Sequence, residues 1–238
     1  DSEAPILRNI SFKAKKGETV AFIGATGSGK SSIINLIPRF YDATAGEVLV
    51  DGVNVKQYKQ EALHAKIGYV SQTAVLFSGT ITSNVSYGET EQIEDSIQAV
   101  KRAVEIAQGK DFVEKFDGQY SGHIAQGGTN VSGGQKQRLS IARAIYRKPE
   151  IYIFDDSFSA LDYKTDRALR MALKKETEHA TTLIVAQRIG TIKEADQILV
   201  LEDGEIVGKG THEQLMKDCK TYQEIAYSQL SKEELSHD

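Results

Sequence analysis

The stretch that decides the fold is Gly24–Ser31, which reads GATGSGKS and fits the pattern G-x-x-x-x-G-K-S of a phosphate-binding loop. An apolar run, residues 19–23, precedes this loop, and a stretch of helical character, residues 32–37, follows it. A strand, a glycine loop and a helix N-terminus in this order direct several backbone N–H groups toward one point. We therefore predict a nucleotide phosphate site formed by Gly24, Ala25, Thr26, Gly27, Ser28, Gly29, Lys30, Ser31 and Ser32.

Two side chains of this loop carry the predicted chemistry. Lys30 places a positive charge for the β- and γ-phosphates, and the Ser31 hydroxyl is a ligand for Mg²⁺. The competing interpretation is a glycine-rich turn with a solvated lysine, and it does not require the flanking strand and helix.

Bulk composition narrows the class of protein. The 238 residues are enough for one large domain, or for a domain with a subdomain. A net charge of −4 argues against nucleic acid as the main partner. The single cysteine, Cys219, excludes an internal disulfide and is expected to be a buried small hydrophobe. No apolar run approaches the roughly 18 residues that cross a bilayer, and residues 1–5 do not resemble a signal peptide, so we expect a soluble chain.

The order of the patterns predicts an α/β fold. We expect a strand over residues 6–13 and a hairpin of residues 46–50 and 53–55 across Asp51-Gly52, followed by alternating strands and helices. The later strands are predicted at 67–71, 151–154, 181–186, 198–201 and 205–208. The helices are predicted at 57–65, 92–107, 111–116, 132–146, 165–176, 212–217 and 222–230. In the helix 165–176, the spacing points Leu169, Met171, Ala172 and Leu173 inward.

Three further stretches narrow the function. Asp155 ends an apolar strand, where a carboxylate can hold Mg²⁺ through water beside the phosphate loop. Ser132-Gly133-Gly134-Gln135 opens a helix, with Ser132 as N-cap, and forms a second anion site that is suited to a nucleotide held by another subunit. Gln72 follows a strand, where its amide could orient a water or touch Mg²⁺. The plainer alternatives are an exposed acid at a strand end, an ordinary helix cap and a polar residue after a strand.

Taken together, these residues resemble the nucleotide-binding domain of ATP-binding cassette (ABC) transporters over essentially the whole chain. The matching segments are Walker A at 24–31, the Q-loop at Gln72, the signature motif at 131–135, Walker B at 151–155 and the D-loop at 159–162, which includes Asp162. Residues 37–42 and 76–81 resemble the exporter branch, which contains multidrug and lipid exporters.

The resemblance implies a P-loop NTPase core over approximately 1–80 and 150–238, with an ABC-type antiparallel β subdomain. It also implies a helical subdomain over approximately 81–149 that carries the signature motif. ATP and Mg²⁺ are the implied cofactors, with Ser31, Gln72 and Asp155 as metal ligands. The implied partners are a second nucleotide-binding domain, which shares two ATP molecules head to tail, and transmembrane domains of the same polypeptide. Nucleic acid is not an expected partner, and the expected location is the cytoplasmic face of the cell membrane.

The chain departs from the family pattern at four places. Asp156 stands where active members have a glutamate that activates water, and Gln187 stands where they have a histidine. Gln126 replaces an acid before the signature motif, and the aromatic residue that stacks on adenine is expected just ahead of Asp1. An aspartate side chain is shorter than a glutamate side chain by about 1.5 Å. A misplacement of the carboxylate by that distance lowers the rate of general-base catalysis on the order of a hundredfold. We therefore expect ATP binding to persist and hydrolysis at the chain's own site, which contains Asp156, Gln187 and Gln72, to be poor.

An intact signature motif beside a defective catalytic site predicts a heterodimeric exporter. Three alternatives remain at this stage: two tolerated conservative changes, a soluble ABC ATPase of DNA repair or translation, and a regulatory ATP-binding module without turnover. The DNA-repair class inserts a long coiled coil between the Walker motifs, and the residues between Lys30 and Asp155 show no sustained heptads. The translation class carries two cassettes in one chain and basic linkers, whereas this sequence shows one cassette and a net charge of −4. A turnover assay separates the regulatory module from the ATPase.

Overall fold

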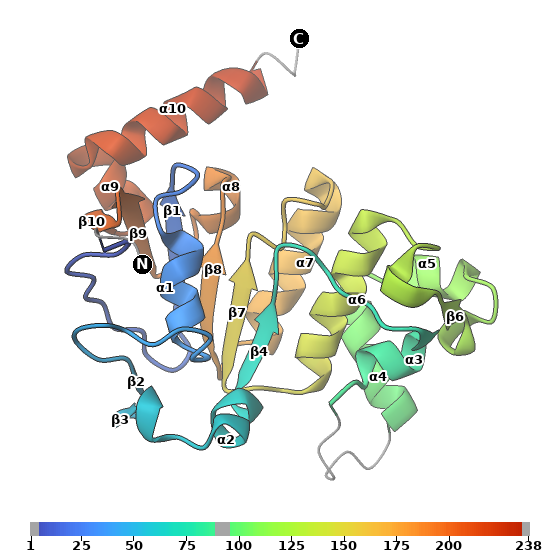
Figure 1. Ribbon diagram of the computed structural model, residues 1–238. Helices are drawn as coiled ribbons and strands as arrows, with labels where there is room; N and C mark the ends of the chain where they lie inside the picture. The colour runs from blue at the N-terminus through green and yellow to red at the C-terminus, as the bar shows by residue number, and fades with distance from the viewer. Residues whose placement is uncertain (1–4, 89–95, 235–238) are drawn as a thin grey trace. The chain divides into compact units, whose positions relative to one another are not determined.

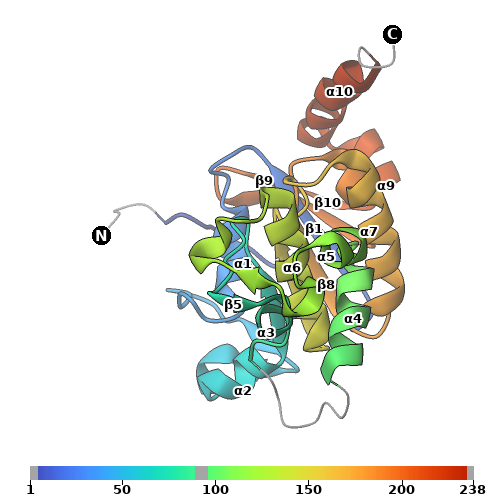
Figure 2. The same ribbon diagram turned by 90° about the vertical axis from the view of Figure 1, so that its right-hand side faces the viewer.

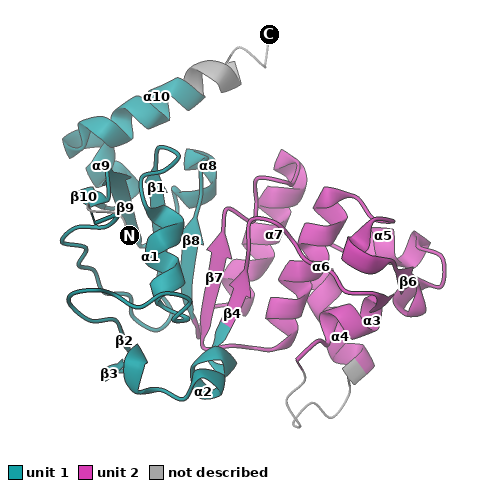
Figure 3. Ribbon diagram, viewed as in Figure 1, with its two compact units in different colours: residues 1–67, 181–238 teal, residues 68–180 magenta. Residues whose placement is uncertain are grey.

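The computed structural model describes residues 5–88 and 96–234 and divides the chain into two compact units (Figure 3). Unit 1 comprises residues 1–67 and 181–238, and unit 2 comprises residues 68–180. Residues 68–80 and 150–180, which we assigned to the predicted ATPase core, thus belong to the same compact unit as the predicted helical subdomain. Among the described residues, no helix combines the length and the apolar character needed to cross a membrane.

Unit 1 is built on a sheet with β1 (Thr19–Gly24) inside it (Figure 1). Strand β1 pairs in parallel with β9 (Gln197–Glu202) and with β8 (Thr181–Val185), and β10 (Glu205–Gly210) pairs antiparallel with β9. The side chains of residues 20–23 are 0–1% exposed. A parallel strand is covered on both faces, which explains why this segment is a continuous apolar run rather than an alternating one.

Helices surround this sheet in unit 1. Helix α1 (Lys30–Leu36) contacts β1 and β8. The chain closes with α8 (Ile189–Ile192), α9 (His212–Asp218) and α10 (Lys220–Glu234). Figures 1 and 2 show α10 following directly on α9, and its backbone contacts α8, α9 and β10.

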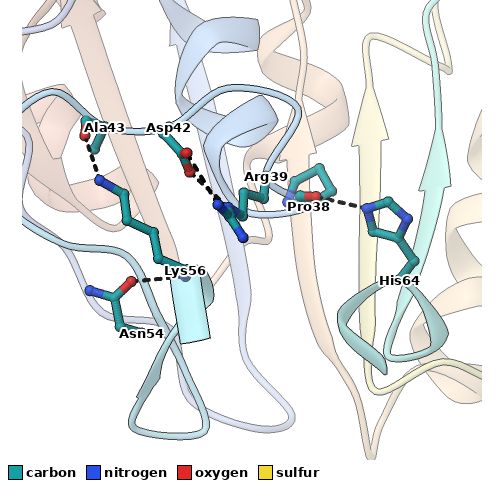
Figure 4. A network of polar contacts seen from close by, with 7 residues as sticks. All are labelled: Pro38, Arg39, Asp42, Ala43, Asn54, Lys56 and His64. Carbon is teal, nitrogen blue, oxygen red and sulfur yellow. Dashed lines mark hydrogen bonds and ion pairs between the residues drawn. The ribbon is translucent and has the colours of Figure 1, made fainter. Parts of the chain in front are cut away.

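Between α1 and residue 67 the chain is held by polar contacts rather than by a long hairpin (Figure 4). The guanidinium of Arg39 donates to the Asp42 carboxylate at 2.8 Å, and His64 Nε2 lies 2.8 Å from the Pro38 carbonyl oxygen. Lys56 Nζ donates to the Ala43 carbonyl at 3.0 Å. The elements of this segment are β2 (Leu49–Val50), β3 (Val53–Asn54), the 3₁₀ turn η1 (Val55–Gln57) and α2 (Gln60–Ala65).

Two strand predictions in unit 1 are corrected. Residues 6–13 form no strand, because Asn9 adopts a left-handed conformation (φ 52°) that breaks an extended run. Of their apolar side chains, Phe12 packs on β1, where its ring meets Phe22 edge-on at 5.4 Å, whereas Ile6 is 67% exposed. The predicted hairpin is shorter than expected because the Asn54 side chain accepts a hydrogen bond from the Lys56 N–H and starts a 3₁₀ turn at Val55.

Unit 2 contains β4 (Ile67–Val70), which begins at the unit boundary, next to β7 (Ile151–Asp155). Its helices are α3 (Ile81–Val85), α4 (Ser96–Ile106), α5 (Lys110–Lys115), α6 (Gly133–Tyr146) and α7 (Tyr163–Glu176). A small ladder pairs β5 (Gly79–Thr80) with β6 (His123–Ile124), and short 3₁₀ turns lie at η2 (Gln119–Ser121) and η3 (Gln126–Gly128). Helix α6 contacts α3 and α4, and α4 also contacts α7.

The predicted α/β class is confirmed, with local adjustments in unit 2. Residues 92–95 of the predicted helix 92–107 lie outside the described residues, and the rest of it is α4. In α7, Leu169 and Leu173 are buried, whereas Met171 is 68% exposed, so its inward placement was wrong. Met171 lies two residues from each leucine, which turns it to the opposite face of a helix with 3.6 residues per turn.

Candidate functional site

The phosphate loop in unit 1 adopts a backbone that only glycine accepts at two places. Gly29 has φ of 100° and lies directly before α1, and a Cβ there would come within 2.6 Å of the Leu7 side chain. Gly24 ends β1, and a Cβ there would come within 2.2 Å of the Leu201 carbonyl oxygen. The glycines of the motif therefore fit both the turn and the close approach of neighbouring chain.

Lys30 is the first residue of α1 and is 9% exposed. Its ammonium donates to the carbonyl oxygens of Gly24 at 2.8 Å and Ala25 at 2.7 Å, and to the Ser28 hydroxyl at 3.4 Å. A buried ammonium needs such acceptors to offset its loss of water. The side chain is thus folded over the loop, and its charge lies where the sequence predicts phosphate to bind.

The rest of the loop differs in exposure. Ala25, Thr26, Gly27 and Ser31 are exposed, Ser32 is partly exposed, and Ser28 is buried. The tip of the loop, Ala25–Gly27, is thus the part that faces solvent.

Unit 2 places two carboxylates at the end of β7. Asp155 is the last residue of the strand and is 8% exposed, and Asp156 is 7% exposed. Asp156 has φ of 46°, in the left-handed region that aspartate tolerates better than most residues. The Ser159 hydroxyl donates to the Asp156 carbonyl at 2.9 Å, which holds this turn.

Gln72 meets Asp156 directly. The Gln72 amide donates from Nε2 to Asp156 Oδ2 at 3.2 Å, across 84 positions in the sequence. Both residues belong to the predicted catalytic set, and the structure brings them together. This hydrogen bond holds the Asp156 carboxylate as an acceptor and directs it toward Gln72, two residues after the end of β4.

The Asp155 carboxylate has a partner that the sequence analysis missed. The Tyr69 hydroxyl donates to Asp155 Oδ2 at 3.2 Å. Burial of Tyr69 and the nearby Asp155 charge raise the pKa of this phenol, so it stays a donor at neutral pH. A phenolic hydroxyl inside an otherwise apolar strand was the available signal, because a buried hydroxyl usually finds a polar partner.

The predicted second anion site begins at the predicted N-cap. Ser132 caps α6 by accepting a hydrogen bond from the Gln135 N–H at 3.3 Å, and the Gln135 side chain accepts one from the Ser132 N–H at 2.9 Å. This reciprocal capping box occupies the first turn, in which Ser132 and Gly133 are exposed. The helix start is therefore well defined, and its outer face is accessible to a partner.

Asp162 caps α7. Its carboxylate accepts hydrogen bonds from the Thr165 N–H at 2.9 Å and from the Thr165 hydroxyl at 2.6 Å. The Thr165 bonds lower the pKa of Asp162 below its ordinary value. Asp162 is exposed, so the cap presents a charged residue at the surface of unit 2.

Gln187 belongs to unit 1 and is the second residue after β8. Its carbonyl accepts a hydrogen bond from the Gln229 amide at 2.7 Å, and the same amide accepts one from the Ile189 N–H at 2.8 Å. Gln229, on α10, thus holds the backbone from the Gln187 carbonyl to the Ile189 N–H, on the C-terminal side of the predicted switch position. The Gln187 residue itself is exposed.

The predicted metal ligands fit Mg²⁺ in chemical type. Within residues 5–88 and 96–234, there is no group of three or more His, Cys, Asp or Glu side chains that could hold a metal ion. The predicted set instead comprises the Ser31 hydroxyl, the Gln72 amide oxygen and the Asp155 carboxylate. All three offer oxygen, and Mg²⁺ is usually held by one or two carboxylates together with waters and substrate phosphates.

Comparisons with known proteins agree on one family. The family described as ABC transporter matches residues 7–159. An uncharacterized ABC transporter ATP-binding protein of Mycobacterium tuberculosis is 48% identical over 228 residues, 96% of this chain and 39% of the relative. A Staphylococcus aureus protein, named as a candidate multidrug export ATP-binding/permease protein, is 43% identical over 94% of this chain and 38% of its own length.

A solved structure gives the same result. The structure of a bacterial Atm1-family ABC exporter with ATP bound matches with a TM-score of 0.91 and 35% identity, over 97% of this chain and 40% of that one. The chain therefore spans about two fifths of the length of the relatives it matches.

Proposed function

The chain belongs to the ABC transporter family as a nucleotide-binding domain, and we propose that it binds Mg·ATP to drive export by transmembrane domains of a longer polypeptide. Membership of the family implies ATP binding and hydrolysis. The observation that carries the proposal is the Lys30 ammonium, buried and folded over a glycine loop at the start of α1. The export and permease terms in a relative's name support transmembrane domains as the partner and the cytoplasmic face of a membrane as the location.

In the proposed site the residues have separate tasks. Lys30 and the N–H groups of the loop bind the phosphates, and Ser31, Gln72 and Asp155 hold Mg²⁺. The ion supplies charge neutralisation for the phosphates when it is bound. Lys30 exchanges its present acceptors, the Gly24 and Ala25 carbonyls, for phosphate oxygens, which carry more charge.

We infer that this site hydrolyses ATP poorly. Asp156 is one methylene shorter than glutamate, and its carboxylate accepts the Gln72 hydrogen bond at 3.2 Å. Both features limit its reach toward an attacking water. Gln187 can donate a hydrogen bond to the γ-phosphate but cannot take up a proton as an imidazole can.

We further propose a heterodimer. The features expected to weaken hydrolysis, Asp156 and Gln187, belong to the site formed with this chain's own Walker motifs. The signature residues Ser132, Gly133, Gly134 and Gln135 are intact and begin a capped helix with an exposed first turn. In a heterodimer they complete a site that contains the partner's glutamate and histidine, so turnover occurs there while this chain retains ATP.

An exposed aromatic pair supports a polypeptide partner for unit 2. The rings of Phe77 and Tyr87 stack with centroids 4.6 Å apart and are 42% and 55% exposed. Arg143 lies over both rings and donates to the carbonyl of Asn84, a residue only 1% exposed, at 2.7 Å. Rigidly held exposed aromatic residues are typical of interaction surfaces, and we assign this pair to the contact with the transmembrane domains.

Two variants of the assembled transporter test the asymmetric function. Gly134→Asp places a carboxylate where the signature motif meets the partner's nucleotide, and we expect it nearly to abolish ATP turnover. Asp156→Asn is expected to cost little, because its site contributes almost none of the turnover. Thermal melting of both variants controls for folding.

The reverse pattern, with Asp156→Asn inactive and Gly134→Asp active, would show that the asymmetric assignment is wrong. An assembled transporter that binds ATP and never turns it over would favour the regulatory module instead.

A further inference from the structure

We propose that Tyr69 is a positioning residue for the Asp155 carboxylate and, through it, for the divalent cation that accompanies ATP. The inference rests on the proposed function and adds to it a residue that the family motifs do not include. Its geometric basis is the hydrogen bond from the Tyr69 hydroxyl to Asp155 Oδ2 at 3.2 Å.

The two residues lie on neighbouring strands of unit 2. Tyr69 is in β4 and Asp155 is the last residue of β7, and Figure 1 shows these strands side by side. A tyrosine side chain has only two rotatable bonds before its rigid ring, so the position of the hydroxyl follows from the position of the strand. The hydroxyl is therefore held at a fixed distance from the β4 backbone, in the position where it contacts the Asp155 carboxylate.

The backbone that carries Tyr69 is itself anchored. The Ser157 hydroxyl donates to the carbonyl of Val70 at 2.8 Å, and the Gln137 amide donates to the carbonyl of Ser71 at 3.1 Å. Ser157 is fully buried and Gln137 is 2% exposed, so these bonds are protected from water. Tyr69 thus starts from a rigid point, as a positioning residue requires.

The phenol is suited to donate rather than to accept. A tyrosine hydroxyl ordinarily keeps its proton throughout the neutral range and can therefore donate. An ionised Asp155 can only accept. The direction of the hydrogen bond is therefore set by both partners.

The consequence concerns the orientation of the carboxylate. Rotation of an aspartate carboxylate about its last bond is broad, and a hydrogen bond to one oxygen selects one orientation of the plane. Partners that orient a metal ligand in this way typically contribute 10–100-fold to metal affinity. Removal of the hydroxyl should therefore weaken the cation more than the nucleotide.

Tyr69→Phe removes the hydroxyl and keeps the ring. We would titrate ATP into the chain by calorimetry at a series of free Mg²⁺ concentrations and in EDTA, and would follow bound Mn²⁺ by electron paramagnetic resonance. Mg²⁺ is expected to increase the affinity for ATP, and half of this increase is reached at a certain free Mg²⁺ concentration. In Tyr69→Phe we expect that concentration to be about tenfold higher, whereas the affinity for ATP in EDTA should be unchanged. The same variant should bind Mn²⁺ about tenfold more weakly in the presence of ATP.

Tyr58→Phe is the matched control. The Tyr58 hydroxyl donates to the Val50 carbonyl at 3.0 Å in unit 1, so this variant also loses one hydroxyl hydrogen bond, but from a backbone acceptor. We expect it to leave the Mg²⁺ requirement and the Mn²⁺ affinity as in the wild type.

Three results would overturn the inference. These are an unchanged metal requirement in Tyr69→Phe, an equal loss of ATP affinity with Mg²⁺ and in EDTA, and a wild-type chain whose ATP affinity does not respond to metal. A wild-type chain that binds no ATP under any condition would instead refute the proposed function, so the two failures can be told apart.

Discussion

Replacement of Asp156 by glutamate tests the proposed cause of poor hydrolysis at this chain's own site. The backbone at this position is held by the Ser159 hydroxyl, which donates to the Asp156 carbonyl at 2.9 Å. With the backbone held, the added methylene should advance the carboxylate by about 1.5 Å. Recovery of a displacement of that size corresponds to about a hundredfold in rate, or about 2.7 kcal/mol of barrier.

The same change should lower stability slightly. Asp156 has φ of 46°, and left-handed backbone costs roughly 1–2 kcal/mol for an ordinary residue but less for aspartate. We therefore expect Asp156→Glu to lose about 1 kcal/mol and to melt about 2–4 °C lower. Faster ATP hydrolysis together with a lower melting temperature in Asp156→Glu is the combination that this explanation of poor hydrolysis predicts.

The assay is ATP hydrolysis by the purified chain with saturating Mg·ATP, together with thermal melting and ATP binding. Asp156→Asn is the matched control, since it keeps the length and removes the charge, and it should not raise the rate. The double change Asp156→Glu with Gln187→His should exceed either single change. If Asp156→Glu binds ATP as the wild type does and hydrolyses it no faster, the reach of the carboxylate is not what limits the site.

Three further predictions concern single side chains. Lys30→Ala should weaken ATP binding by at least about a hundredfold in calorimetric titration, because its ammonium is the charge folded over the loop, and wild-type affinity would refute its role. Asp162→Ala should melt about 2–4 °C lower at pH 7 through loss of the α7 cap. Because the Thr165 bonds lower the pKa of Asp162, its stabilisation is present above about pH 4 and is lost as the pH falls through the lowered pKa, so the two melting curves should converge in acid. Gly68→Ala should cost about 1–3 kcal/mol in denaturant unfolding, since a Cβ there would come within 2.7 Å of the Pro149 ring, and an unchanged midpoint would show that the ring moves aside freely.

The family and the N-cap of α6 could be predicted from local sequence. The loop Gly24–Ser31 works through consecutive backbone groups, so its glycines and lysine identify it without knowledge of distant contacts. The cap of α6 also lies within four residues, and Ser132 proved to be the N-cap that the sequence predicts. The nucleotide, metal and dimer roles of the site residues remain predictions that follow from these motifs and from the family.

Contacts between distant segments were decided only by the tertiary structure. Tyr69 reaches Asp155 across 86 positions and Gln72 reaches Asp156 across 84, and both contacts exist because β4 and β7 are neighbours in the sheet. Strand adjacency is a property of the whole sheet, and no local pattern specifies it. The failed strand at residues 6–13 has the same physical origin. Phe12 packs on β1 through Phe22, while one left-handed residue, Asn9, interrupts the extended backbone that alternation alone would predict.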